Sequence, residues 1–322
     1  MAPSKVVLAS PRGYCAGVDR AVDTVERALD HFGPPVYVRR EIVHNRHVVS
    51  ELTGRGAVFV ETEEDVPPGA VLVLSAHGVA PEVHRRSAQR NLQVLDATCP
   101  LVTKVHAEAR RFAARGYTIV LVGHAGHEEV IGTMGEAPEA IRLVESIADV
   151  EMLDVPDPER VAYITQTTLS VDETVEIIAA LRRRYPAAIG PKRDDICYAT
   201  QNRQDAVKAI LPSVDAVIVV GSPNSSNSNR LREVAAHRGI PAWMIDRADE
   251  LKAEWIAGRN RVGVTAGASA PEILVRQVID RLKELGAERV TELAGTAETI
   301  VFPMPRGLAG EAHAKPPEIG PR

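Results

Sequence analysis

The sequence predicts an α/β fold in which three related small domains, each with a parallel sheet, surround one central site in a pseudo-threefold arrangement. Short apolar segments alternate with amphipathic segments along the chain, which is typical of strands joined by crossover helices. This alternation occurs three times, and each time a cysteine (Cys15, Cys99 or Cys197) stands where a helical pattern opens. A polar loop then follows each cysteine after 28 or 29 residues.

The composition is that of an ordinary globular protein of two or three domains: 322 residues, 45% hydrophobic and 25% charged. A formal net charge of −5 offers no basic field for nucleic acid or an anionic membrane surface, and only two Trp, six Tyr and four Phe are present for base stacking. No apolar run approaches the length of a membrane span, and the first apolar segment is too short for a signal peptide. We therefore expect a cytoplasmic protein that binds neither nucleic acid nor membrane.

The cysteine segments open each repeat. Each cysteine follows a strand-like segment and precedes a helix, and Pro100 suits the first position of its helix. The predicted strands and helix ends are Val6–Ser10 and Leu29 around Cys15, Leu92–Leu95 and Ala114 around Cys99, and Asp194–Ile196 and Leu211 around Cys197.

Two further strands, each followed by a polar loop, complete every repeat. Loops beyond the carboxyl ends of parallel strands build the binding site in open α/β sheets, so these loops are expected to meet around one point. They are residues 43–45, 123–129 and 221–228 after the second strands, and 75–78, 165–168 and 265–269 after the third strands.

The domain boundaries are predicted near Asp96 and Asp194. The three units are residues 1–95, 96–193 and 194–285, followed by a C-terminal extension at residues 286–322. The pattern decays after Gly286, and Pro303–Arg322 contains five Pro and three Gly, which predicts loosely ordered chain at the end.

The three cysteines predict a metal centre. Burial is the ordinary role of a free cysteine, and disulfides are not expected in the cytoplasm. Equivalent positions at three helix N-termini favour the thiolate form, which ligates metal. Structural zinc usually has four ligands with a close cysteine pair, which the sequence lacks. Three distant thiolates suit an iron–sulfur cube that leaves one iron open for a substrate oxygen.

The polar loops predict an anion site. His44, His77 and His127 follow strands in equivalent positions, although a single histidine there is more often a structural residue. The third unit offers small hydrogen-bond donors at the matching positions, which together with the histidines suit a phosphate or diphosphate. Those donors are Ser225, Ser226, Asn227 and Ser269. Because few Lys or Arg are near, we expect binding to depend on protonated histidine and to weaken as pH rises.

Glu129 is the predicted general acid, because it lies in a glycine-flanked loop two residues after His127. The neighbouring Glu128 is expected to be solvated. Thr167 and Thr168 could hold a substrate hydroxyl or relay a proton, and the alternative for both is capping of the helix that begins near Val171.

The motifs together resemble one family, the 4-hydroxy-3-methylbut-2-enyl diphosphate reductases of the non-mevalonate isoprenoid pathway. The similarity extends from Lys5 to about Pro305. The matching motifs are Pro11–Val18, Ser75–Val79, Asp96–Pro100, Gly126–Val130, Thr165–Ser170, Cys197–Thr200 and Asn224–Ser228. A departure is Glu128, where the family usually has proline; the extra carboxylate is expected to raise the pKa of Glu129 by repulsion.

The resemblance implies a [4Fe–4S] cluster with three cysteine ligands and one open iron, an allylic diphosphate substrate and reductive removal of its hydroxyl group. The products would be isopentenyl and dimethylallyl diphosphate. It implies that Cys15, Cys99 and Cys197 hold the cluster and that Glu129, Thr167 and His127 are catalytic. The implied diphosphate ligands are His44, His77, His127, Ser225, Ser226, Asn227 and Ser269, and Thr168 is counted with the substrate site. An external electron donor, ferredoxin or flavodoxin, is implied as well, since no flavin or nicotinamide motif is evident.

Three other functions stay open on the residues alone. A non-redox iron–sulfur hydro-lyase acting on a phosphorylated substrate would also use an open iron. A non-catalytic iron–sulfur sensor or phosphate-binding module would need the same ligands without Glu129. A zinc-dependent enzyme would use the thiolates for a different metal.

Overall fold

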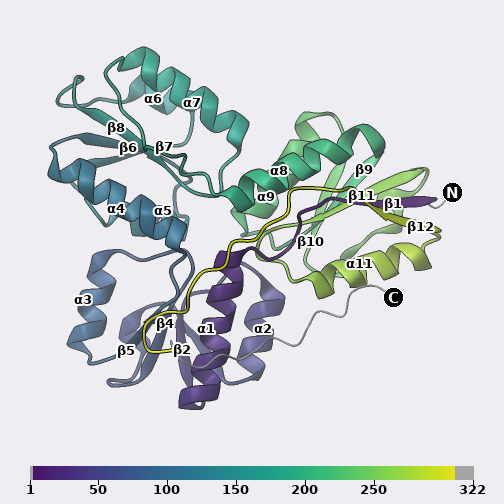
Figure 1. Cartoon of the computed structure of the whole chain (residues 1–322), viewed down its shortest axis with the longest axis horizontal. Helices are drawn as coiled ribbons and strands as arrows, with labels where there is room; N and C mark the ends of the chain where they lie inside the picture. Colours follow the sequence, from purple (N-terminus) through teal and green to yellow (C-terminus); the bar gives the residue numbers. More distant parts are fainter. Residues whose placement is uncertain (1–2, 309–322) are drawn as a thin grey trace.

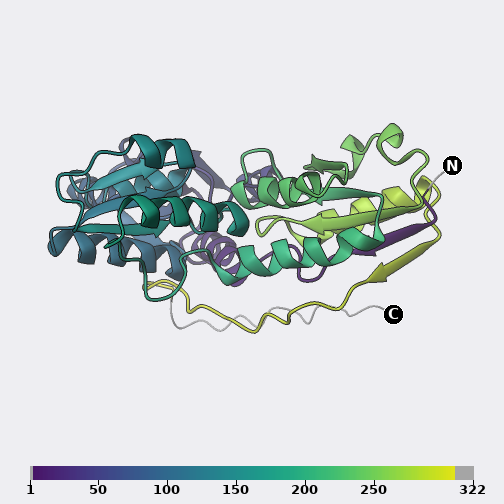
Figure 2. The same ribbon diagram turned by 90° about the horizontal axis from the view of Figure 1, so that it is seen from above.

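The computed structural model describes residues 3–308 and has three lobes, each built on a small parallel sheet (Figure 1). Seen from above, the molecule is long and shallow, with the first two lobes together at one end and the third at the other (Figure 2). No helix in residues 3–308 combines the length and the apolar character needed to cross a bilayer. The three parallel sheets and the helices between their strands confirm the α/β class that the sequence predicts.

The first lobe has a four-stranded sheet in the order β3-β2-β4-β5. Its interior is made by apolar residues of the sheet and of α1, such as Val36, Val38 and Val25, all fully buried. Its elements are α1 (Ala16–Phe32), β2 (Val36–Arg39), α2 (Arg46–Gly54), β3 (Ala57–Val60), β4 (Val71–Leu74), α3 (Pro81–Gln89) and β5 (Gln93–Asp96).

The second lobe has a three-stranded sheet in the order β7-β6-β8. Ile189 extends it by a single parallel bridge to Ala162. Its strands β6 and β8 are buried along almost their whole length and are mostly apolar, as expected for parallel strands covered by helices. Its elements are α4 (Pro100–Ala114), β6 (Thr118–Val122), α5 (Glu128–Met134), β7 (Ile141–Val144), α6 (Ile147–Met152), β8 (Val161–Thr165) and α7 (Val171–Arg184).

The third lobe has a five-stranded sheet in the order β10-β9-β11-β1-β12, so the first and the last strand of the described chain are neighbours in it. Its elements are β1 (Lys5–Leu8), α8 (Tyr198–Ile210), β9 (Ala216–Val220), α9 (Ser226–His237), β10 (Ala242–Ile245), α10 (Ala253–Ile256), β11 (Arg261–Ala266), α11 (Glu272–Glu284) and β12 (Arg289–Glu292).

The structure differs from the expected units at the strands that precede the cysteines. β1 pairs in parallel with β11 and β12 of the third lobe, not with the strands of residues 1–95. β5, which the repeat pattern places before Cys99, pairs with β4 of the first lobe, at the end of the expected unit of residues 1–95, and leads through Cys99 into the second lobe. No strand covers Asp194–Ile196; the corresponding contact is the bridge at Ile189. Hydrophobic periodicity identifies a strand but not its partner, which is why the sequence did not reveal this arrangement.

This topology places the cysteines between lobes. Each cysteine lies on the segment that leaves one lobe and enters the first helix of the next, at α1, α4 and α8. These three connecting segments converge where the three lobes meet (Figure 1). The connections between lobes therefore form the centre of the molecule.

The segment after Gly286 is more ordered than the sequence suggests. It forms β12 and then runs back along one side of the molecule to the first lobe (Figures 1 and 2). Glu298 pairs with the buried Arg203 of α8 at 3.0 Å, Arg20 of α1 donates to the Pro303 carbonyl, and Leu308 joins the core of the first lobe. This segment ties the third lobe to the first. The predicted loose order falls largely on residues 309–322, which lie outside the described residues.

Candidate active site

The three cysteines are the N-cap residues of α1, α4 and α8, as the sequence predicts. All three are free thiols that line one pocket. Gly17 shows how closely they approach: a Cβ at this position would lie 2.8 Å from Cys99 Sγ and 3.8 Å from Cys15 Sγ. A side chain at residue 17 would therefore intrude on both sulfur atoms.

Burial has the opposite effect on these thiols from the one expected at helix N-termini. Burial, together with the charges of neighbouring cysteines, raises the pKa of Cys99 to about 12 and that of Cys197 to about 11. Desolvation thus outweighs the backbone N–H groups that favour thiolate. Three thiolates become favourable here when a bound cation displaces their protons, which is the behaviour of a metal site. The donor set therefore fits a thiolate-bound metal centre.

Glu129 lies close to the cysteines and is almost completely buried. Its carboxylate accepts two hydrogen bonds from Thr167, one from the backbone N–H at 2.6 Å and one from the hydroxyl at 2.9 Å. Burial raises the pKa of Glu129 to about 7, against the lowering effect of Thr167, and Asp195 adds to the rise. A carboxyl group of this kind is a proton donor near neutral pH. The expected contribution of Glu128 to this shift is absent, because that side chain turns toward His77.

Hydrogen bonds join the acid to the cysteine loops. The backbone N–H of Cys197 donates to the Thr167 carbonyl at 3.0 Å. On the other side, Cys197 Sγ lies 3.1 Å from the hydroxyl of Thr200, to which Asn227 donates at 3.3 Å. A shift of the Thr167 loop would therefore move a sulfur atom and the acid together.

The three histidines form one cluster on the pocket wall. The rings of His44 and His77 are stacked, with centroids 4.0 Å apart, and His127 stands at right angles to both. The backbone N–H of Glu129 donates to His127 Nδ1, so the proton of the neutral ring lies on Nε2. Burial lowers the pKa of His127 to about 3 and also lowers that of His77. Before an anion binds, these two rings are neutral donors rather than the cations expected from the sequence.

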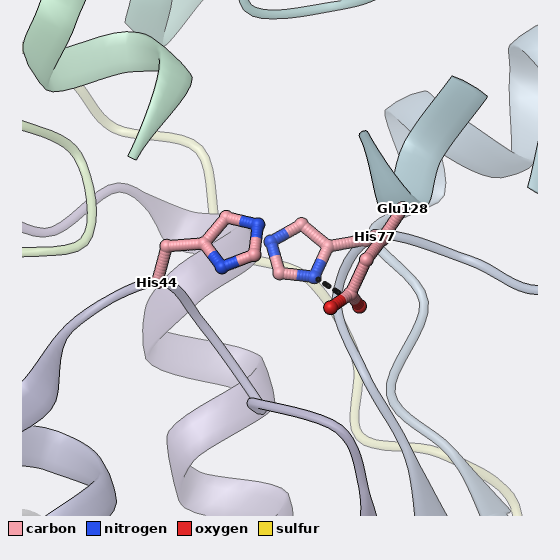
Figure 3. A group of neighbouring side chains, drawn as sticks. All are labelled: His44, His77 and Glu128. Atoms are coloured by element: carbon pink, nitrogen blue, oxygen red, sulfur yellow. Dashed lines mark ion pairs between the residues drawn. The ribbon is translucent and has the colours of Figure 1, made fainter. Parts of the chain in front are cut away.

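Carboxylates stand behind two of the rings. Glu41 Oε2 lies 3.0 Å from His44 Nδ1, and Glu128 Oε2 lies 3.4 Å from His77 Nδ1 (Figure 3). Asn224 donates to Glu41 at 2.7 Å. Among the described residues, His44, His77 and Glu128 form a group whose ligand atoms lie within 4.8 Å of one another.

The third lobe supplies the opposite wall of the pocket. The hydroxyl groups of Ser225 and Ser269 lie 3.3 Å apart, and that of Ser269 donates to the His44 carbonyl. Asn227 accepts from the backbone N–H of Ala268, and Ser225 is the N-cap of α9. These hydroxyl, amide and helix N-terminal groups are uncharged donors that suit an oxyanion.

The structure brings every predicted site residue to this one pocket. Its lining includes Cys15, Cys99, Cys197, His44, His77, His127, Glu129, Thr167, Thr168, Ser225, Ser226, Asn227 and Ser269. Arg46, the cation nearest in sequence, instead forms an ion pair with Asp246 and is largely exposed.

Sequence reasoning missed several residues that shape the pocket. Gly17 and Thr200 contact cysteine sulfur atoms, and each lies two or three residues after a cysteine, so the spacing could have revealed them. Arg203 donates to the carbonyls of Gly13 and Tyr14 beside Cys15, and this contact between distant segments leaves no local signal.

Comparison with known proteins agrees with this geometry. The family model described as LytB protein matches residues 6–283. This protein belongs to the LytB family. The chain is 59% identical over 307 residues to the 4-hydroxy-3-methylbut-2-enyl diphosphate reductase of Ralstonia nicotianae, covering 95% of each chain. It is 60% identical over 305 residues to 4-hydroxy-3-methylbut-2-enyl diphosphate reductase 1 of Mycobacterium bovis, covering 94% of this chain and 91% of the relative.

Solved structures of LytB-family relatives show the same fold. The E-1-hydroxy-2-methyl-but-2-enyl-4-diphosphate reductase of Plasmodium falciparum superposes with a TM-score of 0.92 at 37% identity, over 95% of this chain and 97% of that one. A structure described as (E)-4-hydroxy-3-methyl-but-2-enyl diphosphate reductase, the terminal enzyme of the non-mevalonate pathway, gives 0.62 at 34% identity over 87% and 99% of the chains.

Proposed function

We propose that this protein reduces (E)-4-hydroxy-3-methylbut-2-enyl diphosphate to isopentenyl and dimethylallyl diphosphate. The observation that carries the proposal is one pocket that combines three convergent cysteines, a buried carboxylic acid and a wall of oxyanion donors. The names of relatives that are about 60% identical over nearly the whole chain support it. The balanced reaction takes two electrons and two protons and releases the allylic hydroxyl as water.

Cys15, Cys99 and Cys197 would hold a [4Fe–4S] cluster with one iron free of protein ligands. The cluster would supply electrons and a Lewis-acidic site for the hydroxyl group. Gly17 leaves the approach to two of the sulfur atoms open, and the backbone N–H of Thr200 donates to Cys197 Sγ at 3.3 Å. Hydrogen bonds to thiolate sulfur adjust the reduction potential of such clusters.

The diphosphate would lie between the histidine cluster and the third lobe. Ser225, Asn227 and Ser269 would donate to its oxygens without a change of charge, while His77 would gain a proton as the anion approaches. His127 would donate from Nε2, because its Nδ1 already accepts from the backbone. Ser226, whose hydroxyl donates to the Thr168 carbonyl, would complete this wall of the site together with Thr168.

Glu129 would deliver protons to the reacting carbon or to the departing hydroxyl. Its raised pKa keeps a large part of the carboxyl groups protonated near pH 7. Thr167 fixes the orientation of the acid and can itself donate to a substrate hydroxyl. Electrons would come from an external carrier such as a ferredoxin or flavodoxin.

Anaerobic iron and sulfide analysis, combined with a dithionite-driven assay on the allylic diphosphate, tests this function. We expect about four irons per chain, reductant-dependent turnover, and loss of both in Cys197→Ser. Dehydration of the substrate without reductant would favour the hydro-lyase instead. A colourless, iron-free protein from anaerobic purification would favour a zinc enzyme.

A further inference from the structure

Glu128 is a partly buried carboxylate that the proposed reaction does not use. It is the first residue of α5, directly after His127, and only 16% of its side chain is exposed. A carboxylate directly behind the histidine wall of an anion-binding pocket repels the ligand unless its charge is offset by a neighbouring group. The Glu128 carboxylate faces His77, on the side of the ring away from His44 (Figure 3).

Each of the two stacked rings has its own carboxylate: Glu41 lies beside His44, and Glu128 lies beside His77. Each carboxylate lies beside an Nδ1 atom, at 3.0 Å for His44 and 3.4 Å for His77. One nitrogen of each ring faces the other ring (Figure 3). Two adjacent imidazolium ions repel each other, and His44 does lower the pKa of His77. The carboxylates behind the rings offset that repulsion, so His77 can become an imidazolium ion while the anion is bound.

The other charged groups around His77 do not replace this contact. His44 and His127 are imidazole rings that carry no negative charge, and Glu41 contacts His44 instead of His77. Arg40 lies on the far side of Glu128, at 3.9 Å from its carboxylate. On α4, next to Gly78, His106 is paired with Glu136 at 2.8 Å. Glu128 is thus the carboxylate in contact with the His77 ring.

A metal ion is the competing explanation, because two histidines and a glutamate are a common zinc ligand set. The ring geometry disfavours it. The planes of His44 and His77 differ by only 22° with centroids 4.0 Å apart, so their in-plane lone pairs run in nearly parallel planes. They do not converge on one point about 2 Å from each nitrogen, as zinc requires.

We propose that Glu128 is a positioning residue that holds the Nδ1 proton of His77 and thereby extends diphosphate binding to higher pH. The proposal rests on the proposed function for the identity of the ligand. Its physical content is the binding of a pyrophosphate group, which can be measured without turnover.

The test compares Glu128→Gln and Glu128→Pro with the wild-type holoenzyme under anaerobic conditions. Gln keeps the shape of the side chain and removes its charge. Proline suits the first helical position, where the backbone N–H has no intrahelical partner, so it removes the carboxylate in a second way. Glu284→Gln, at an exposed ion pair with Arg281 on α11, is the matched control.

The measurement is the affinity for inorganic pyrophosphate between pH 6 and 9, with KM and kcat for the allylic diphosphate alongside. In both Glu128 variants we expect the pH at which affinity is half lost to fall by about one unit, the effect of one charge-assisted contact. The control should keep the wild-type midpoint, and kcat at low pH should stay within about twofold of wild type because proton delivery belongs to Glu129. Pyrophosphate itself also changes charge over this pH range, but this effect is the same for every protein and does not contribute to the difference between their midpoints.

An unchanged or raised midpoint in both variants would overturn the proposal, and so would a fall in kcat with unchanged affinity. Zinc that strengthens pyrophosphate binding to the wild type but not to Glu128→Gln would overturn it in favour of a metal site. If the allylic diphosphate is not turned over but the pyrophosphate midpoint shifts as expected, the proposed reaction fails and the role of Glu128 stands.

Discussion

Glu128 and Glu129 are neighbours at the start of one helix, yet Glu129 lines the pocket, whereas Glu128 lies behind its histidine wall, and the two have opposite electrostatics. Glu128 contacts the histidine wall from behind, where burial raises its pKa but His77, His44 and Arg40 together outweigh that effect and lower it. Glu129 lies beside the cysteines, where burial raises its pKa to about 7. Its hydrogen-bond partners there are the neutral donors of Thr167.

The difference shows that partners, more than burial, decide the charge of a pocket carboxylate. Both side chains are largely removed from water, at 16% exposure for Glu128 and 2% for Glu129. A group that can take up a proton and become a cation stabilises a carboxylate more than two neutral donors do. One turn of helix therefore places a proton donor in the pocket and a partner of His77 behind the pocket wall.

The largest effect that separates the two residues is expected in kcat. Glu129→Gln removes the proton donor and should lower kcat by about 10²- to 10⁴-fold. Glu128→Gln should leave kcat nearly unchanged. Steady-state kinetics with dithionite, at equal iron content, measure both.

Iron content is the essential control for this comparison, because Thr167 links Glu129 to the Cys197 loop. Equal kcat values for Glu129→Gln and the wild type, at matched iron content, would remove Glu129 from proton delivery. A loss of iron in Glu129→Gln would instead assign it a structural role beside the metal centre.

Much of this comparison could be predicted from the sequence. The spacing of the cysteines and of His44, His77 and His127 predicts one shared pocket, because loops after parallel strands meet at the same sheet edge. The same pattern indicates Glu129, because it lies two residues after His127 in the polar loop that follows a strand. Local patterns of this kind identify which residues gather at the site.

Contacts between distant segments could not be predicted in the same way. The sequence suggests that Glu128 is solvated, whereas the packing of α5 against the loop after β4 places it beside His77. Arg203 and Glu298 are 95 residues apart and meet only because the C-terminal segment returns across the lobes. The pKa values of the cysteines and histidines follow from burial, which depends on the packing of all three lobes.

The second effect is on stability, and it has opposite signs for the two carboxylates. The folded protein binds the Glu129 proton more tightly than the unfolded chain does, because the pKa rises from 4.5 to about 7. Stability from this source is complete below about pH 4.5 and is lost as pH rises to about 7, by about 3 kcal/mol at most. Glu129→Gln, which cannot ionise, should therefore be more stable than the wild type at pH 8 and similar to it near pH 4.5.

Glu128 should behave in the opposite way, since its pKa is lowered in the folded protein. Its contribution is present above the ordinary carboxyl pKa and is lost as pH falls through the lowered value. Glu128→Gln should therefore be less stable than the wild type at neutral pH. Denaturant midpoints of the anaerobic holoenzymes at several pH values test both signs, and a Glu129→Gln variant that is destabilised equally at every pH would contradict the assignment.

The smallest effect concerns the hydroxyl group of Thr167, which donates to Glu129 at 2.9 Å and favours its ionised form. Thr167→Val keeps the backbone hydrogen bond and the shape of the side chain but removes this donor. The pKa of Glu129 should rise further, so the alkaline fall in kcat should move to higher pH, with a loss of about tenfold or less at its maximum. Thr167→Ser retains the hydroxyl and should keep the wild-type pH profile. Because Glu128 is on the other wall, the pH dependence of pyrophosphate affinity should be the same in all three proteins, and a change there would show that the two carboxylates act as one unit.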